Sequence, residues 1–104
     1  MIKTAEEFKR LRESDLPEDY QRAAQESADI NVWETVLKEY ADMAFWVAQN
    51  KTVPIQILEK LAKNSDPKVR DMVARKRKIP ESLMLSLAND EDGSVRNALV
   101  NNGR

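Results

Sequence analysis

The chain has 104 residues, a formal net charge of −1, and neither cysteine nor histidine. These values indicate a modest core, and they exclude disulfide bonds, thiolate metal sites and catalysis by histidine. The sequence also lacks a phosphate-binding glycine loop and an apolar run long enough to span a membrane, so we expect a cytoplasmic protein.

The first two predicted helices lie at the start of the chain. Thr4 and Glu7 have the spacing of a capping box, so we expect a helix over residues 5–14. Pro17 suits the first turn of a second helix over residues 17–28, since its missing N–H would have no intrahelical partner there. These two helices are expected to cap the rest of the chain.

Two further helices are predicted before the middle of the chain. Asn31 precedes apolar residues at helical spacing and is expected to cap the third helix. Asp42 is expected to cap the fourth helix, whose apolar face carries Met43, Trp46 and Val47. No stretch of the chain shows the alternation of polar and apolar residues that is typical of a strand.

Two stretches of the sequence repeat each other at a spacing of 26 residues. Residues 47–70 align with residues 73–96 without an insertion, and a third partial copy begins at Leu99. The identical pairs are Val47/Val73, Ala48/Ala74, Pro54/Pro80, Leu61/Leu87, Ala62/Ala88, Asp66/Asp92, Val69/Val95 and Arg70/Arg96. A period of this length is typical of repeat arrays, in which each helix pair buries its apolar face against its neighbours.

Each repeat starts its helices at a proline or an aspartate. Pro54 and Pro80 are expected to start first helices, and Asp66 and Asp92 to cap second helices. Helices of about ten residues are marginal in isolation, so packing between them must stabilise the fold. We therefore expect a single all-α domain, an α-solenoid of short paired helices. Its expected parts are a helical cap (1–29) and three repeat units (30–54, 54–80 and 80–104).

The repeat unit resembles a known family pattern. Val47-Ala48-x-Asn50 is followed by Pro54, then by Leu58-x-x-Leu61-Ala62 and by Asp66-x-x-Val69-Arg70. This order is similar to the leucine-rich-repeat variant and HEAT-like families, over residues 43–104. The resemblance implies a right-handed superhelix of alternating helices, and says little about activity.

The architecture of the whole chain carries a second resemblance. A short acidic helical segment at the N-terminus, followed by about three repeats, resembles small bacterial immunity proteins, such as those of contact-dependent growth inhibition systems. This resemblance implies an inhibitor that binds and occludes a cognate toxin domain without chemistry of its own.

Arginines and asparagines recur at repeat positions, and we expect structural roles for both. Arg70 and Arg96 stand four residues after Asp66 and Asp92, a spacing that predicts an Asp–Arg ladder between adjacent repeats rather than a phosphate site. Asn50 and its equivalent two repeats later, Asn102, follow the second helices, where an asparagine in the left-handed conformation can end a helix.

Phe45 is the most informative position for function. Its equivalents are polar, Asp71 and Asn97, so the position is expected to face water. An aromatic residue there either contacts a partner or packs against the N-terminal helices. Trp46 aligns with apolar residues and is expected in the core. We expect a partner-binding surface on the exposed side of the second helices, with rows Phe45/Asp71/Asn97 and Gln49/Arg75/Asn101.

Charge is distributed unevenly along the chain. Residues 1–45 have a net charge of −5, and residues 46–104 have a net charge of +4. If the partner is a basic toxin nuclease, the acidic half would steer its association. Glu34, Glu39 and Asp42 are then candidate contacts.

The run Arg75–Lys78 is the one basic cluster and supports an alternative, nucleic-acid binding. Only Lys51 and Arg104 offer basic residues near the same register in other repeats, so the sequence favours a protein partner. A generic protein-interaction adaptor and a capping module of a longer array remain open. We expect no enzymatic activity, cofactor or metal, and the sequence does not indicate the oligomeric state.

Overall fold

The computed structural model describes residues 1–102 and is all-helical over them, as predicted. It contains eight α-helices and one short 3-10 helix, η1, and its one β-bridge pairs Ile2 with Ala28. The elements are α1 (Ala5–Glu13), α2 (Pro17–Gln25), α3 (Ile30–Glu39), η1 (Ala41–Met43), α4 (Ala44–Gln49), α5 (Ile55–Leu61), α6 (Pro67–Ala74), α7 (Glu81–Ala88) and α8 (Gly93–Val100).

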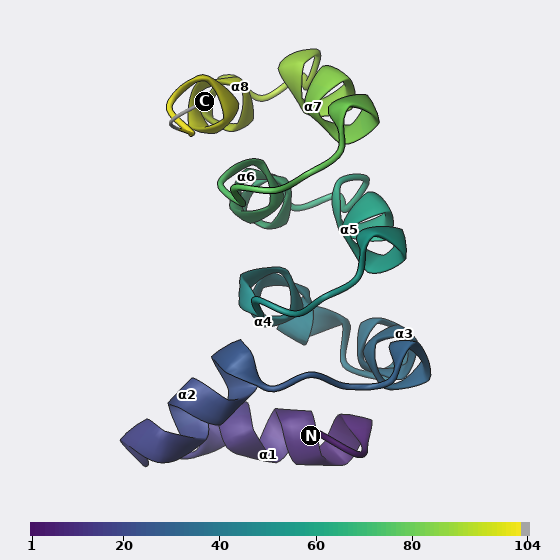
Figure 1. Cartoon of the computed structure of the whole chain (residues 1–104), viewed down its shortest axis with the longest axis vertical. Coiled ribbons are helices and arrows are strands. Elements are labelled where there is room, and N and C mark those ends of the chain that lie inside the picture. Colours follow the sequence, from purple (N-terminus) through teal and green to yellow (C-terminus); the bar gives the residue numbers. More distant parts are fainter. Residues whose placement is uncertain (103–104) are drawn as a thin grey trace.

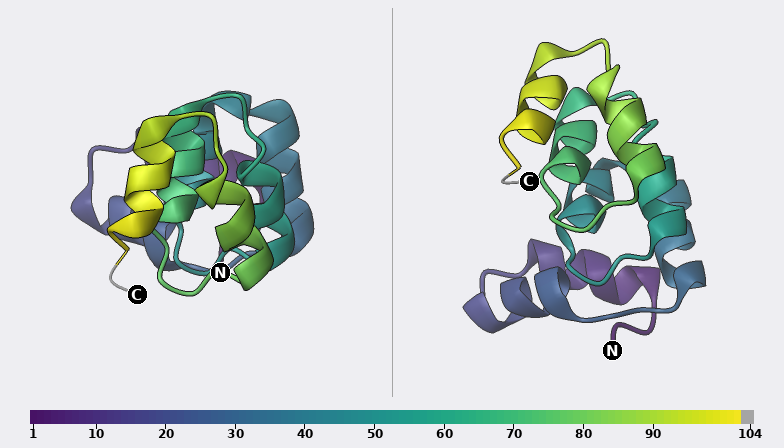
Figure 2. Two further views of the ribbon diagram at one scale, coloured as in Figure 1. Left: turned by 90° about the horizontal axis from the view of Figure 1, so that it is seen from above. Right: turned by 45° about the horizontal axis from the view of Figure 1, so that its top comes forward.

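The helices from α3 onward follow one another in pairs along the longest dimension of the molecule, which measures 35 × 25 × 20 Å (Figure 1). We call each pair a layer: α3 with α4, α5 with α6, and α7 with α8. Helices α4, α6 and α8 lie side by side in one column, and α3, α5 and α7 lie in the other (Figure 2). Helices α1 and α2 cross the far end and pack on α3 and α4.

Most predicted helix starts are confirmed, and two are wrong. The carboxylates of Asp66 and Asp92 cap α6 and α8, accepting from the backbone N–H two residues later. Helix α3 is capped by Asp29, not Asn31, because the Asp29 carboxylate accepts from the Asn31 N–H at 2.9 Å. Asp42 caps nothing and lies inside η1, where a backbone bond from the Met43 N–H to the Tyr40 carbonyl turns the chain.

One apolar core runs through all the layers. Apolar positions that repeat every 26 residues are buried in it: Val47 and Val73 are both 0% exposed. Phe8 of α1 meets Trp33 of α3 edge to face at 5.2 Å between ring centres, which joins the N-terminal helices to the first layer. Burying one such large apolar side chain stabilises a fold by about 1.5–3 kcal/mol.

Arg70 joins two layers with a partner other than the predicted one. Its guanidinium donates to the carboxylate of Asp90 at 2.8 and 3.1 Å, and to the Asn64 carbonyl at 2.7 Å. Burial alone would raise the pKa of Asp90, but the bonds from Arg70 and the Asp92 N–H outweigh it and lower that pKa. The ladder therefore runs from Arg70 to the next layer's turn, because Asp66 is occupied as a helix cap.

Asn50 is the C-cap of α4, as predicted, but its backbone is extended and not left-handed, and its side chain also joins α4 to the N-terminal helices. It is fully buried in an extended conformation, and its side-chain amide donates to the Ala23 and Glu26 carbonyls at 2.8 and 3.0 Å. The equivalent Lys76 donates to the Asn50 carbonyl at 2.8 Å, and Asn102 donates to the Lys76 carbonyl at 2.7 Å. In all three copies, this position therefore holds a side chain that donates to a backbone carbonyl of the part of the chain one repeat earlier.

Candidate binding surface on helices α4, α6 and α8

Two adjoining pockets lie along the column of second helices, and we call them together the double pocket. The first has a volume of about 620 Å³, the second of about 490 Å³, and they share Arg75 and Arg77. Gln49, Lys51, Val53, Leu58, Met72 and Arg75–Lys78 line the first. Arg75, Arg77, Ser94, Asn97, Ala98, Asn101 and Asn102 line the second.

Four of the six predicted row residues come together at the double pocket. Gln49 and Arg75 line the first pocket, and Arg75, Asn97 and Asn101 line the second. Asp71 stands beside them, because its carboxylate pairs with Arg75 at 3.3 Å. The side chains of three successive layers can thus contact one ligand.

The first pocket is cationic around an apolar floor. Its five basic side chains are Lys51, Arg75, Lys76, Arg77 and Lys78, and no acidic residue within the described chain is among its lining. Burial lowers the pKa of Lys76, whose ammonium group donates to a backbone carbonyl. The floor of Val53, Leu58 and Met72 is absent from the sequence prediction, because only layer packing brings these residues under the basic loop.

Two acceptor atoms at this surface lack hydrogen-bond partners. Gln49 Oε1 and Asp71 Oδ1 are buried and make no hydrogen bond within residues 1–102. The amide of Gln49 is itself anchored, since its Nε2 donates to the Tyr20 hydroxyl at 2.9 Å. Both oxygens are covered by neighbouring atoms, so they form part of the wall of this surface and are not exposed to a ligand.

Phe45 lies outside the lining of the double pocket. It is half-buried and meets Trp46 edge to face, with 4.9 Å between ring centres. Trp46, predicted in the core, is itself only half-buried. The Arg12 guanidinium covers it 3.6 Å from the ring centre and also lies 4.7 Å from the Tyr20 ring. This end of the surface is therefore shaped by α1 and α2.

The predicted acidic contacts lie apart from the double pocket. Glu34 on α3 pairs with Lys60 on α5 at 2.9 Å, so it belongs to the column of first helices. Asp42 lies near Lys9, whose pKa is raised mainly by its bond to Glu13 and further by Tyr40 and Asp42. Glu39 lies near Tyr40, whose pKa is raised by burial and by neighbouring carboxylates that include Glu39.

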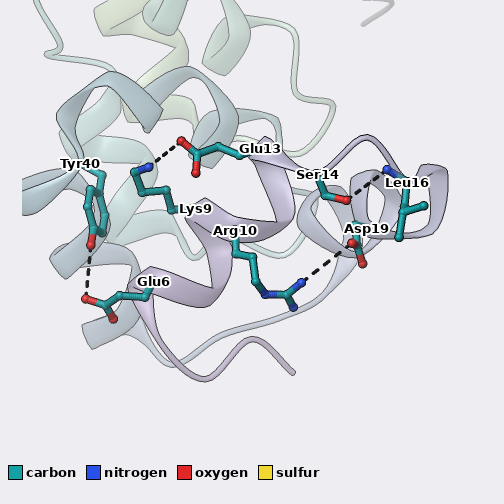
Figure 3. A pocket seen from close by; sticks show the side chains of 8 residues that line it. All are labelled: Glu6, Lys9, Arg10, Glu13, Ser14, Leu16, Asp19 and Tyr40. Atoms are coloured by element: carbon teal, nitrogen blue, oxygen red, sulfur yellow. Dashed lines mark hydrogen bonds and ion pairs between the residues drawn. The ribbon is translucent and has the colours of Figure 1, made fainter.

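A third pocket, of about 530 Å³, lies where α1 meets the end of α3. Its lining is Glu6, Lys9, Arg10, Glu13, Ser14, Leu16, Asp19 and Tyr40 (Figure 3). Its charges satisfy one another: Lys9 pairs with Glu13, Arg10 lies 3.9 Å from Asp19, and the Tyr40 hydroxyl donates to Glu6 at 3.4 Å. The pocket therefore offers few groups to a ligand.

Comparison with family models, with curated proteins and with solved structures finds no match to this chain. Among residues 1–102, no helix combines the length and apolar character needed to cross a bilayer. No group of three acidic side chains in the same range is arranged to hold a metal ion. Arg104, considered above as a basic register position, lies outside the described residues.

Proposed function

We propose that this chain is a non-enzymatic protein-binding helical-repeat protein. In this proposal the layers form a right-handed HEAT-like solenoid of period 26, capped by residues 1–29. The double pocket carries the proposal, because residues that differ between layers gather there while their apolar neighbours repeat.

The specific role we propose is inhibition of a cognate bacterial toxin domain by occlusion. Occlusion needs a stable surface and no reacting group, which suits a chain without histidine or cysteine. The layers are joined by buried polar ties such as Arg70–Asp90, so the surface is held in one arrangement. A generic adaptor would use the same surface, and the identity of the partner distinguishes the two roles.

The proposal is tested by affinity capture with matched variants of the tagged protein. We expect the wild type to retain one stoichiometric protein partner and Arg75→Glu to lose it, because this change reverses charge where the two pockets meet. Lys63→Glu is the control, since it makes the same charge change at an exposed position outside the double pocket. Equal capture by Arg75→Glu and wild type would contradict the proposed surface.

Association kinetics test the steering role of the acidic half. Reversing Glu39 and Asp42 to lysine is expected to slow association with a basic partner, with a larger effect at low salt. Glu34 is less suitable for this test because its reversal also breaks the ion pair with Lys60. An unchanged association rate would remove steering from the proposal and leave occlusion intact.

A second candidate function, nucleic-acid binding, is favoured by the five basic side chains around the first pocket. Phosphate binding by these groups would give an affinity that falls steeply with salt concentration. Gel-shift titration with single-stranded RNA and with duplex DNA tests it, using Lys78→Glu with Lys63→Glu as the matched control. Salt-dependent binding of nucleic acid that is lost in Lys78→Glu and retained in Lys63→Glu would favour nucleic-acid binding over protein binding as the function.

A further inference from the structure

Basic side chains from two successive loops line the first pocket of the double pocket. Lys51 lies in the loop between α4 and α5, and Arg77 and Lys78 lie in the loop between α6 and α7 (Figure 1). Lys51 and Arg77 are equivalent at the 26-residue spacing, so the stacking of two layers brings their loops to one pocket. The pocket thus gathers more positive charge than the run Arg75–Lys78 carries by itself.

Two of these basic groups have no carboxylate partner. Lys51 and Lys78 are exposed, and neither ammonium group makes an ion pair within residues 1–102. Arg75 pairs with Asp71 at 3.3 Å, but Asp71 lies outside the lining of the pocket. A concave surface that carries one sign of charge over apolar walls concentrates its electric field. The first pocket is therefore suited to negatively charged groups.

This positive charge does not continue along the column of second helices. The second pocket shares Arg75 and Arg77 with the first, and its other lining residues are neutral. On the other side, α4 contains no charged residue. A nucleic-acid strand is bound through phosphates repeated along its length and through bases stacked on aromatic rings, and neither pocket has an aromatic side chain in its lining within the described chain. The arrangement therefore favours a short acidic segment over a nucleic-acid strand.

The floor of the first pocket suits an apolar group beside the acidic ones. Val53 and Leu58 are 8% and 4% exposed, and Met72 between the two pockets' helices is half-buried. The flexible side chain of methionine packs against apolar groups of varied shape. An inorganic anion would leave this floor in contact with water, whereas an apolar side chain flanked by carboxylates would cover it. The lining therefore matches a ligand that is both acidic and apolar.

We propose that the first pocket binds an acidic segment of the partner protein, one that places an apolar side chain on the floor and carboxylates against Lys51 and Lys78. This inference rests on the proposed function, because it states the chemistry of the partner at the double pocket. It concerns one segment of the partner and not the partner's net charge. A basic partner that is steered by the acidic half of this chain can carry such a segment.

The experiment selects a displayed library of short random peptides against the full chain. We expect the enriched peptides to carry aspartate or glutamate on both sides of an apolar residue. The most enriched peptide is then labelled and titrated by fluorescence anisotropy, and we expect Lys51→Glu and Lys78→Glu in the full chain each to weaken its binding about tenfold or more. Enrichment of peptides that are not acidic would overturn the proposal.

Lys63→Glu is the matched control in the full chain, because it makes the same charge change at an exposed position outside the double pocket. The proposal expects unchanged peptide affinity for this variant, and an equal loss in Lys63→Glu and Lys51→Glu would overturn it. Replacing the apolar residue of the peptide by serine should also weaken binding. Equal binding of the serine peptide would overturn the proposal, as would displacement of the labelled peptide by single-stranded RNA at lower concentrations than by unlabelled peptide.

Peptide selection and affinity capture together separate this inference from the proposed function. If no acidic peptide is enriched, but the wild type captures a protein partner that Arg75→Glu loses, the acidic segment is overturned and the proposed function stands. If acidic peptides are enriched and their binding depends on Lys51 and Lys78, but no protein partner is captured, the ligand chemistry of the pocket is supported and the proposed function fails.

Discussion

At the scale of the residue, polar side chains that recur every 26 positions make interlayer contacts in this molecule. Arg70 and Asp90 have side chains only 9% exposed, and each satisfies the charge of the other. Asn50 satisfies two carbonyls of the N-terminal helices, and its own side-chain oxygen accepts from the Thr52 N–H at 2.8 Å. These contacts join the second layer to the third, and the first layer to the N-terminal helices.

Breaking the buried ion pair is expected to destabilise the fold strongly. Asp90→Asn retains the shape of the turn but leaves the buried Arg70 guanidinium without its counter-charge. Removing one partner of a buried pair costs about 3–5 kcal/mol, so we expect a loss of about 3 kcal/mol in the free energy of unfolding, measured by urea denaturation.

Glu91→Gln is the control for this change. Glu91 is next in the chain, lies 4.0 Å from the same guanidinium and has a side chain 91% exposed, so we expect a change of about 0.5 kcal/mol or less. Similar losses in the two variants would show that net charge near the turn matters and that the buried geometry does not.

At the scale of the element, the N-terminal helices are held together by a charge cluster. Arg22 of α2 donates to Glu7 of α1 at 3.0 Å and pairs with Glu26. The Arg22 hydrogen bond is the largest cause that lowers the pKa of Glu26, to about 2, and the N-terminal ammonium group also lowers it. The pKa of Glu7 is lowered by the Lys3 N–H and by Arg22.

This cluster predicts acid sensitivity. Because the pKa of Glu26 is lower in the folded than in the unfolded state, its stabilising effect is present above the ordinary glutamate pKa of about 4.5 and is lost as the pH falls toward about 2. We expect the free energy of unfolding to decrease over that range, and the decrease to be smaller in Glu26→Gln. Urea denaturation at a series of pH values measures both.

The matched control is Glu59→Gln, which removes a carboxylate at an exposed position on α5. It should retain the full acid-induced decrease of the wild type. An acid response in Glu26→Gln that is as steep as the wild-type response would assign the sensitivity to other carboxylates, such as Asp90 and Asp92, whose pKa values are also lowered.

At the scale of the whole molecule, the two ends differ. The first layer is covered by α1 and α2, with Phe8 packed on Trp33, whereas the last layer leaves Val100 exposed. In a stack where each layer contacts only its neighbours, a terminal layer has one stabilising interface where an interior layer has two.

Amide hydrogen exchange should report this difference. Helices α6 and α8 each have eight residues, but α6 lies between α4 and α8. We expect the amides of α8 to exchange faster than those of α6 when measured by mass spectrometry, because local opening of α8 breaks fewer contacts. Equal protection of the two helices would mean that the molecule opens only as a single cooperative unit.

Features that depend on neighbouring residues in the chain were predictable from the amino-acid sequence. Thr4 caps α1 and accepts from the Glu7 N–H at 3.0 Å, and Asp66 and Asp92 cap their helices, as predicted. Such bonds join groups two or three residues apart, so composition and spacing reveal them. The all-α class was predictable for the same reason, because helical spacing and caps are local signals.

Contacts between groups far apart in the chain were not predictable in this way, because they depend on the packing of the helices. The partner of Arg70 is 20 residues away in the sequence, and the carbonyls bound by Asn50 are 24 and 27 residues away. The Arg12 guanidinium of α1 lies over the Trp46 ring of α4. The double pocket joins residues from three successive layers. These contacts depend on how the helices stack and turn relative to one another, which is set by the packing of the whole core and not by any local spacing.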